Sequence, residues 1–195
     1  MSAQIKPSDR FKKNMIILLD IISDMFCEGS ENGIVETDNK LLSILKIIIN
    51  STDSDYMINN FIRKSHPYWE KIRAKDIDYF KDHGMELFTS VKEKGVDSYK
   101  EGTNNTFIKN LKDKHVDNFK KLLESTYTVN GEEVDILDQE RKEDIWKILN
   151  SFVRISISHI HRERNYKNGK YLTEYFPEIK IKENVEKWEI RGIKF

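Results

Sequence analysis

The sequence has little of several residue types that define whole classes of protein. A single cysteine, Cys27, in 195 residues excludes a disulfide framework and any zinc or iron–sulfur site built from several cysteines. Only 8 glycines and 3 prolines argue against low-complexity linkers and turn-rich all-β folds. Lys+Arg and Asp+Glu number 33 each, so the zero formal charge excludes a globally basic nucleic-acid binder and an acidic tail protein.

Long hydrophobic runs are also missing. The run 15–22 is interrupted by Asp20, and the run 41–49 is interrupted by Ser43 and Lys46, so neither resembles a membrane span of about 20 apolar residues. The first residues lack the pattern of a secretory signal, and neither end carries a lipidation motif. We therefore expect a soluble protein with a cytoplasmic location (host cytoplasm or virion for a viral chain) and no membrane partner.

Apolar residues recur at helical spacing over most of the chain. The clearest stripe comprises Phe11, Met15, Leu18, Leu19, Ile22 and Phe26. It predicts a helix that begins after Ser8 and ends at Gly29. Later helices are predicted to begin at Asp53, Asp76 and Asp138, each of which can cap a helix N-terminus. A short helix with Trp69 and Ile72 is predicted to begin at Pro67.

The region from 127 onward adds two further features. Asn130-Gly131 between apolar residues predicts a small hairpin or tight turn. Apolar positions from Ile145 to Ile160 run most of the way round a helix, as in a central, buried helix. Within that stretch 153–158 alternates like a strand, but continuity with the pattern from 145 to 149 favours helix.

These patterns predict a mainly α fold. We expect a single-domain bundle of about six to seven helices with a short β-hairpin or an extended C-terminal arm. The helical domain spans 1–164, with a soft internal boundary near 89–95. The arm spans 165–195 and packs on the body or on a partner.

Two segments, 61–88 and 145–161, carry a resemblance to a known group of proteins. They pair a Trp-x-x-Ile and Asp-x-x-Phe unit with a later Ile-Trp helix rich in Val and Ile. The matching residues are Trp69, Ile72, Asp76, Phe80, Ile145, Trp146, Phe152, Val153 and Ile157. The pattern resembles small, mostly helical, uncharacterised proteins of large nucleocytoplasmic (giant) DNA viruses. The resemblance implies an all-helical fold and a viral protein, and it supplies no catalytic residues.

One cluster contains the residue types that ligate metals: His159, His161 and Glu163. On a strand, alternate side chains share a face and all three could hold one ion. On a helix, residues two apart point about 200° from each other, and only His159 aligns with Glu163. Because the stretch is predicted to be helical, we assign no metal site, no catalytic residue and no cofactor.

The same region is locally basic, with Arg154, Arg162, Arg164, Lys167 and Lys170 against one acid. Lys and Arg bind phosphates while neighbouring tyrosines stack on bases, so this patch is a candidate for nucleic-acid or anion binding. The alternative is that it balances the acidic block 131–144 and complements the dipole of the last helix.

Large aromatic side chains are frequent in the predicted arm. They include Tyr171, Tyr175, Phe176, Trp188 and Phe195. Such residues need a surface to cover them, which is either the protein's own body or a partner. We therefore favour a non-enzymatic module for protein–protein interaction, self-association or assembly. A nucleic-acid-binding accessory protein that uses 154–170 is the first alternative, and a metal-dependent enzyme is the second.

Overall fold

The computed structural model describes residues 5–36, 39–80, 82–83 and 113–166, with the side chains of 39–41, 113–116 and 161–166 left undescribed. The elements are the helices α1 (Pro7–Glu31), α2 (Asn39–Ser51), α3 (Ser54–Ser65), α4 (Trp69–Arg73), α7 (Asp113–Glu124) and α8 (Gln139–Tyr166), the 3₁₀ turn η1 (His66–Tyr68), and the strands β1 (Thr126–Val129) and β2 (Glu132–Asp135). Residues 77–80 are also helical. The prediction of a mainly α fold with a short hairpin is confirmed.

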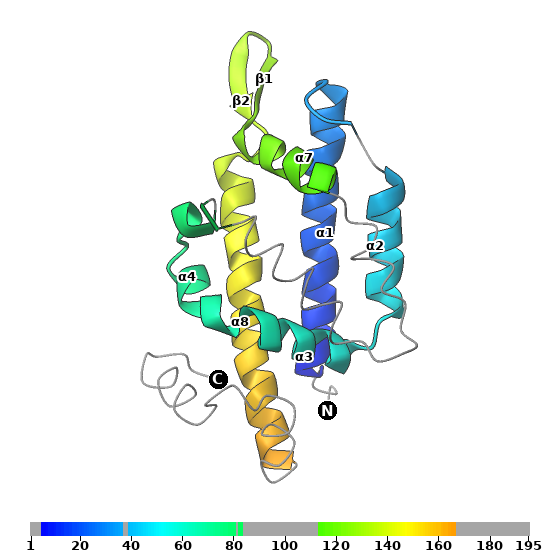
Figure 1. Ribbon diagram of the computed structural model, residues 1–195, viewed down its shortest axis with the longest axis vertical. Helices are drawn as coiled ribbons and strands as arrows, with labels where there is room; N and C mark the ends of the chain where they lie inside the picture. Colours follow the sequence, from blue (N-terminus) through cyan, green and yellow to red (C-terminus); the bar gives the residue numbers. More distant parts are fainter. Residues whose placement is uncertain (1–4, 37–38, 81, 84–112, 167–195) are drawn as a thin grey trace.

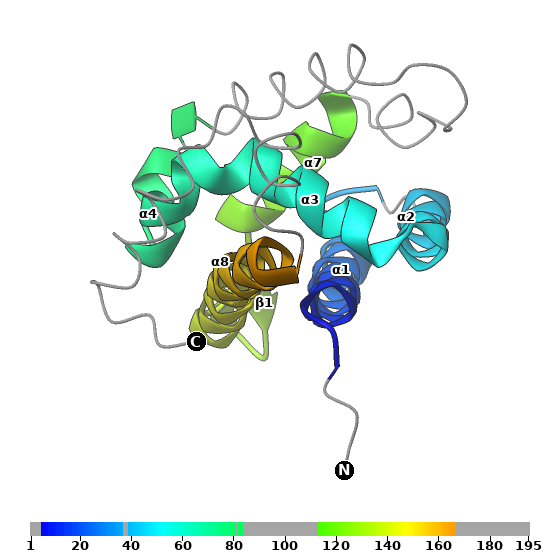
Figure 2. The same cartoon turned by 90° about the horizontal axis from the view of Figure 1, so that it is seen from below.

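Two long helices, α1 and α8, lie side by side through the whole body (Figure 1). Asn14 near the start of α1 donates a hydrogen bond to Ser151 in the middle of α8 at 2.8 Å. At the opposite end, Glu28 of α1 pairs with Arg141 near the start of α8. The two helices are therefore antiparallel. Figure 2, seen along them, shows α2, α3 and α7 all on one side of the pair.

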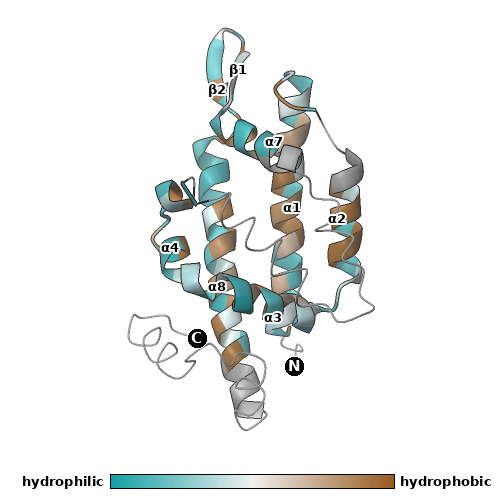
Figure 3. Ribbon diagram, viewed as in Figure 1, coloured by the Kyte–Doolittle hydropathy of each residue, from teal (hydrophilic) through white to brown (hydrophobic). Residues whose placement is uncertain are grey.

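The larger hydrophobic cluster, called here the aromatic core, joins α1, α3, α4 and α8. At its centre the rings of Phe11, Phe61 and Phe152 pack with centroids 4.6 to 5.5 Å apart. Trp69 and Ile72 add the face of α4. Brown, hydrophobic stretches of α1 and α8 in Figure 3 alternate with hydrophilic ones, as expected for helices with one buried side.

The smaller cluster, called here the aliphatic core, lies where α1 ends and α8 begins. It contains Met25 and Val35 together with Leu122 of α7, Ile136 and Leu137. The hairpin β1–β2 projects from this end (Figure 1) and pairs Tyr127 with Val134. Asn130 and Gly131 both have positive φ, 53° and 85°, as a two-residue hairpin turn with two left-handed positions requires.

Most predicted helix starts are confirmed. The side chains of Asp53, Asp76 and Asp138 each accept a hydrogen bond from the backbone N–H three residues later. Pro67 lies in η1, directly before α4 with its buried Trp69. The stretch 153–163 is helical, so the strand-like alternation of its β-branched residues does not make it a strand.

Two details of the α1 prediction are wrong. The helix begins at Pro7, so Ser8 lies inside the first turn and is buried instead of capping the helix. It also continues through Gly29 to Glu31. Gly29 is buried because α7 crosses there: a Cβ on Gly29 would lie 2.2 Å from Cδ2 of Leu122. This glycine therefore allows a close helix contact and does not end the helix.

Several predictions concern residues that the structure does not describe. They are the boundary near 89–95 and nearly all of the arm 165–195. Among the described helices, none is both long enough and apolar enough to span a membrane.

Candidate interaction face

Charge is divided between the two ends of α1. The first half of the helix carries Arg10, Lys12 and Lys13 against Asp9. From residue 20 to residue 36 the chain has no Lys or Arg, and its acids are Asp20, Asp24, Glu28, Glu31 and Glu36. α1 therefore has a basic end and an acidic end, and antiparallel α8 places its own first turns, with Glu140, Glu143 and Asp144, beside the acidic end of α1.

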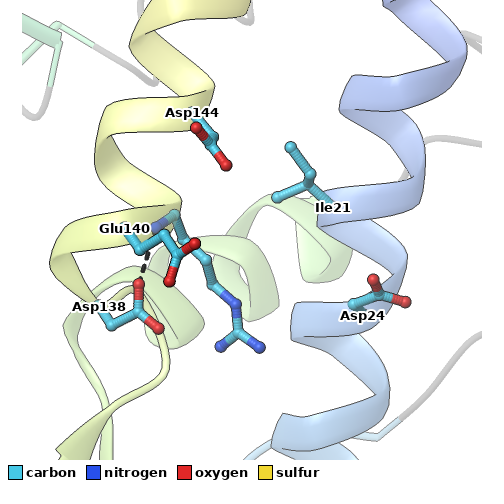
Figure 4. A pocket seen from close by; sticks show the side chains of 6 residues that line it. Ile21, Asp24, Asp138, Glu140 and Asp144 are labelled. Carbon is cyan, nitrogen blue, oxygen red and sulfur yellow. Dashed lines mark hydrogen bonds between the residues drawn. The ribbon is translucent and has the colours of Figure 1, made fainter.

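A shallow groove of about 300 Å³ runs between α1 and α8 at the acidic end. Figure 4 shows Ile21 of α1 and Asp144 of α8 pointing toward each other across it, and Asp24 and Glu140 also line it. Asp138 and Arg141 complete the lining. The groove therefore has an apolar floor at Ile21 and mainly carboxylate walls, which suits a cationic group with an alkyl stem.

Two of these carboxylates have structural roles as well. Asp138 accepts the backbone N–H of Arg141 at 2.7 Å and so caps α8. Asp144 binds Nζ of Lys147 one turn along the same helix at 2.8 Å. Asp24 and Glu140 are exposed, and neither has an ion-pair partner within the described part of the chain. These two are the carboxylates available to a ligand.

A compact charged cluster holds the acidic end together. The carboxylate of Glu28 accepts hydrogen bonds from the Tyr127 hydroxyl on β1 and from the Arg141 guanidinium on α8. Arg141 also donates to the backbone carbonyl of Ile136. The bond to Glu28 and burial both raise the pKa of Tyr127, because the phenolate would face a carboxylate. Glu28 thus ties α1, the hairpin and α8 to one another.

Exposed residues recur every seven positions along both long helices. On α1 they are Arg10, Ile17 and Asp24; on α8 they are Glu140, Lys147 and Arg154. Seven residues are nearly two helical turns, so each set of three follows one side of its helix. Asp24 and Glu140 line the same groove, so the two sets come together at the acidic end. We call these six residues the open face.

The helices α2, α3 and α7 lie on one side of the α1–α8 pair (Figure 2), and all six residues of the open face are exposed, so these helices do not cover them. Ile17 at the middle of the α1 set is 43% exposed, although it is a large aliphatic side chain. Ile21, one turn along α1 from Ile17, lines the groove. The two isoleucines place apolar surface between two oppositely charged ends, which suits an interaction surface.

The three candidate metal ligands, to which the sequence assigned no metal site, lie on α8 and not on a strand. His159 is buried, and its Nε2 lies 3.1 Å from Oδ1 of Asn59 on α3. The backbone at His161 and Glu163 is helical, which removes the strand geometry that a three-residue site required. In the described part of the chain, no three His, Cys, Asp or Glu residues are grouped to hold a metal ion.

The predicted basic patch begins on α8. Arg154 is exposed. The backbone at Arg162 and Arg164 belongs to the last turns of the same helix. Lys167 and Lys170 lie outside the described residues, as do the arm residues Tyr171, Tyr175, Phe176, Trp188 and Phe195.

Sequence reasoning missed the groove and the charged cluster behind it. The acids of 131–144 were noted only as a block, and their facing partners on α1 are more than one hundred residues away. A signal was nevertheless present: 20–36 has five acids and no Lys or Arg, on a predicted amphipathic helix. When a segment of an amphipathic helix carries charges of one sign only, those side chains form a charged surface outside the protein's own core.

One comparison with known proteins gave a match. A family model described as a domain of unknown function (DUF8601) matches residues 36–117. The matched stretch contains α2, α3, η1 and α4 and is less than half of the chain. Neither a curated protein nor a solved structure matches the chain. Most of the groove and all six residues of the open face lie on α1 and α8, outside the matched stretch.

Proposed function

We propose that the protein is a non-enzymatic helical module for protein–protein interaction or assembly, and that it docks through the open face. The observation that carries the proposal is Ile17, exposed at the centre of two rigidly paired helices whose ends have opposite charge. The viral origin implied by the sequence resemblance is part of this proposal. The C-terminal arm 165–195, with its aromatic residues, remains a predicted second site of contact with a partner.

Three properties of the face support a protein partner. Both helices are fixed from behind by the aromatic core, so the face is preorganised. The groove beside Ile17 offers an apolar floor with carboxylate walls, which can receive a lysine or arginine side chain. Arg10 and Arg154 at the other end can receive carboxylates. A partner is therefore oriented by charge and held by apolar contact.

The experiment places a photo-cross-linking amino acid at position 17 of the full chain, in extract of the cells that contain it. A matched chain carries the same group at Ile47, which is 65% exposed on α2 and is not part of the open face. We expect one defined adduct from position 17, and we expect Asp24→Lys to abolish it. Equal adducts from 17 and 47, or an adduct unaffected by Asp24→Lys, would contradict the proposal.

A nucleic-acid-binding accessory role is the second candidate, and the exposed basic end of α1 favours it. Arg10 and Lys13 on α1 lie at the same end as Arg154 on α8. This basic end can contact phosphates, and Arg162 and Arg164, which follow Arg154 on α8, are further candidate contacts.

This candidate predicts a steep loss of affinity for DNA or RNA as salt rises. Fluorescence anisotropy with a labelled oligonucleotide measures the slope of log affinity against log salt concentration. Arg154→Ala together with Arg162→Ala and Arg164→Ala should reduce the slope by about one unit per lost phosphate contact. Lys147→Ala, at the middle of the face, is the control. No binding at low salt would end this candidate.

A further inference from the structure

The open face has a property that selects its partner: it is complementary to itself. Along α1 it runs from Arg10 through Ile17 to Asp24. Along antiparallel α8 it runs from Arg154 through Lys147 to Glu140. Both helices therefore present a basic group at one end, a central residue, and an acidic group at the other end.

We propose that the partner is a second copy of this chain, which forms an antiparallel two-fold dimer through the open face. This inference rests on the proposed function, whose docking surface it uses. Two identical faces can meet about a two-fold axis in their plane, either parallel or perpendicular to the helices. A parallel axis would bring basic end to basic end. A perpendicular axis brings each basic end onto an acidic end, so charge selects the perpendicular axis.

The contacts of this dimer follow from the seven-residue spacing. Arg10 lies opposite Asp24 of the second copy, and Arg154 lies opposite Glu140 of the second copy, each contact occurring twice. Ile17 lies at the axis, opposite its own copy, where the two exposed side chains cover each other. The dimer is a four-helix arrangement in which α1 packs on α1 and α8 packs on α8.

Lys147 is the charged residue of the open face that the axis brings against its own copy. Its ammonium already binds Asp144 of the same helix at 2.8 Å, and this contact raises the pKa of Lys147 and offsets its charge. Arg10, Asp24, Glu140 and Arg154 have no such partner within the described residues. The four charges that the dimer pairs are thus the unpaired ones, and the charge that it leaves at the axis is already paired.

The test is sedimentation velocity on the purified full chain across a concentration series. We expect a monomer–dimer equilibrium that weakens between about 0.01 M and 1 M salt, because exposed ion pairs are screened. Arg10→Glu alone and Asp24→Lys alone should each raise the dimer dissociation constant by about tenfold or more, because each creates two like-charge contacts. Glu124→Lys, on exposed α7 behind the face, is the matched charge reversal and should leave the dissociation constant unchanged.

The decisive step mixes the two variants. A copy with Arg10→Glu and a copy with Asp24→Lys pair opposite charges at both contacts, so an equimolar mixture should form heterodimers although each variant alone is monomeric. Arg10→Glu with Asp24→Lys in one chain should restore the homodimer as well. Ile17→Asp should abolish both the heterodimer and the homodimer, while Ile47→Asp should abolish neither. Circular dichroism of each variant shows whether it is folded.

Two outcomes would overturn the second-copy partner. One is a wild-type chain that stays monomeric at low salt up to about millimolar concentration, where even weak dimers form. The other is a mixture of the two charge variants that stays monomeric. If position 17 still cross-links to a different protein, the interaction function stands without the dimer. If position 17 and position 47 behave alike, both proposals fail.

Discussion

The two cores of the molecule hold the same pair of helices at opposite ends by different means. Among the described residues, the aromatic core has ten buried apolar residues, and three phenylalanine rings in it contact one another. The aliphatic core has five buried apolar residues and no buried aromatic residue. The aliphatic core also has a close contact between α1 and α7 at Gly29, which has no side chain, and the charged cluster Glu28–Tyr127–Arg141.

The difference follows from what each end has available to bury. Around the aromatic core, α8 has buried residues on more than half of its circumference, because α1, α3 and α4 all contact it. At the other end the hairpin is largely exposed, and its strands contribute little buried area. Where apolar area is scarce, close backbone approach and partly buried polar bonds contribute the stability. The acidic groove lies at this second end.

The largest expected effect comes from emptying the aromatic core. Phe152→Ala should lower the free energy of unfolding by about 3–5 kcal/mol, because Phe152 contacts both Phe11 and Phe61 and is fully buried. Leu122→Ala in the aliphatic core should cost less, about 2–3 kcal/mol. Urea unfolding followed by circular dichroism measures both. An equal or larger loss at Leu122 would show that the aliphatic core is the stronger of the two.

The next effect tests the close contact that the aliphatic core depends on. In a helix interior, replacing glycine by alanine ordinarily gains about 1 kcal/mol. Gly29→Ala should instead cost about 1–3 kcal/mol, since the new methyl group overlaps Leu122 and lies 3.2 Å from Val35. In a Leu122→Ala background the same substitution should be neutral or stabilising. Additive effects of the two substitutions would contradict a direct overlap.

The sequence was sufficient to predict the elements of the aromatic core. Its helices have strong caps at Asp53 and Asp138 and a proline-started turn before Trp69, all of which act over three to four residues. The β-branched stretch 153–158 was predicted helical, against its local preference, because the neighbouring turns have helical spacing. Propagation along a helix outweighs the preference of a few residues.

The sequence was not sufficient where contacts join distant segments. Gly29 looked like a helix end because glycine is costly inside helices, and only the crossing of α7 explains why it continues. The buried Asn59–His159 pair and the Glu28 cluster join residues about one hundred positions apart. The carboxylates that line the groove also come from segments that are far apart in the sequence. Single-sequence patterns report local periodicity and do not report which faces meet.

A smaller effect is expected from the charged cluster at the aliphatic core. Glu28→Gln removes the charge that faces Arg141 and should cost about 1 kcal/mol, since the pair is only partly buried. Glu31→Gln, exposed one turn later, is the control and should change stability by less than about 0.5 kcal/mol. The loss at Glu28 should shrink in high salt. A loss independent of salt would mean that the carboxylate acts through packing and not through charge.

The smallest expected effect is a difference between the two cores in how their stability depends on pH. The hydrogen bond to Glu28 and burial raise the pKa of Tyr127, so the folded state holds its phenolic proton more tightly than the unfolded chain does. The contribution of this bond is therefore fully present below the unfolded pKa of about 10 and is lost as pH rises through the folded pKa. The stability advantage of wild type over Tyr127→Phe should fall between about pH 9 and 11.

The same comparison in a Glu28→Gln background, which removes the carboxylate charge from the Tyr127 phenol, is the control and should show a much weaker trend. Hydrogen exchange at rising pH, corrected for intrinsic exchange rates, locates the change. Protection should decline first in β1, β2 and the first turns of α8, while Phe152 and its neighbours stay protected, because the bond between the Tyr127 phenol and the Glu28 carboxylate lies at the aliphatic core. Simultaneous loss of protection at both ends would mean that the two cores unfold as one unit, and their different construction would then have no consequence for local stability.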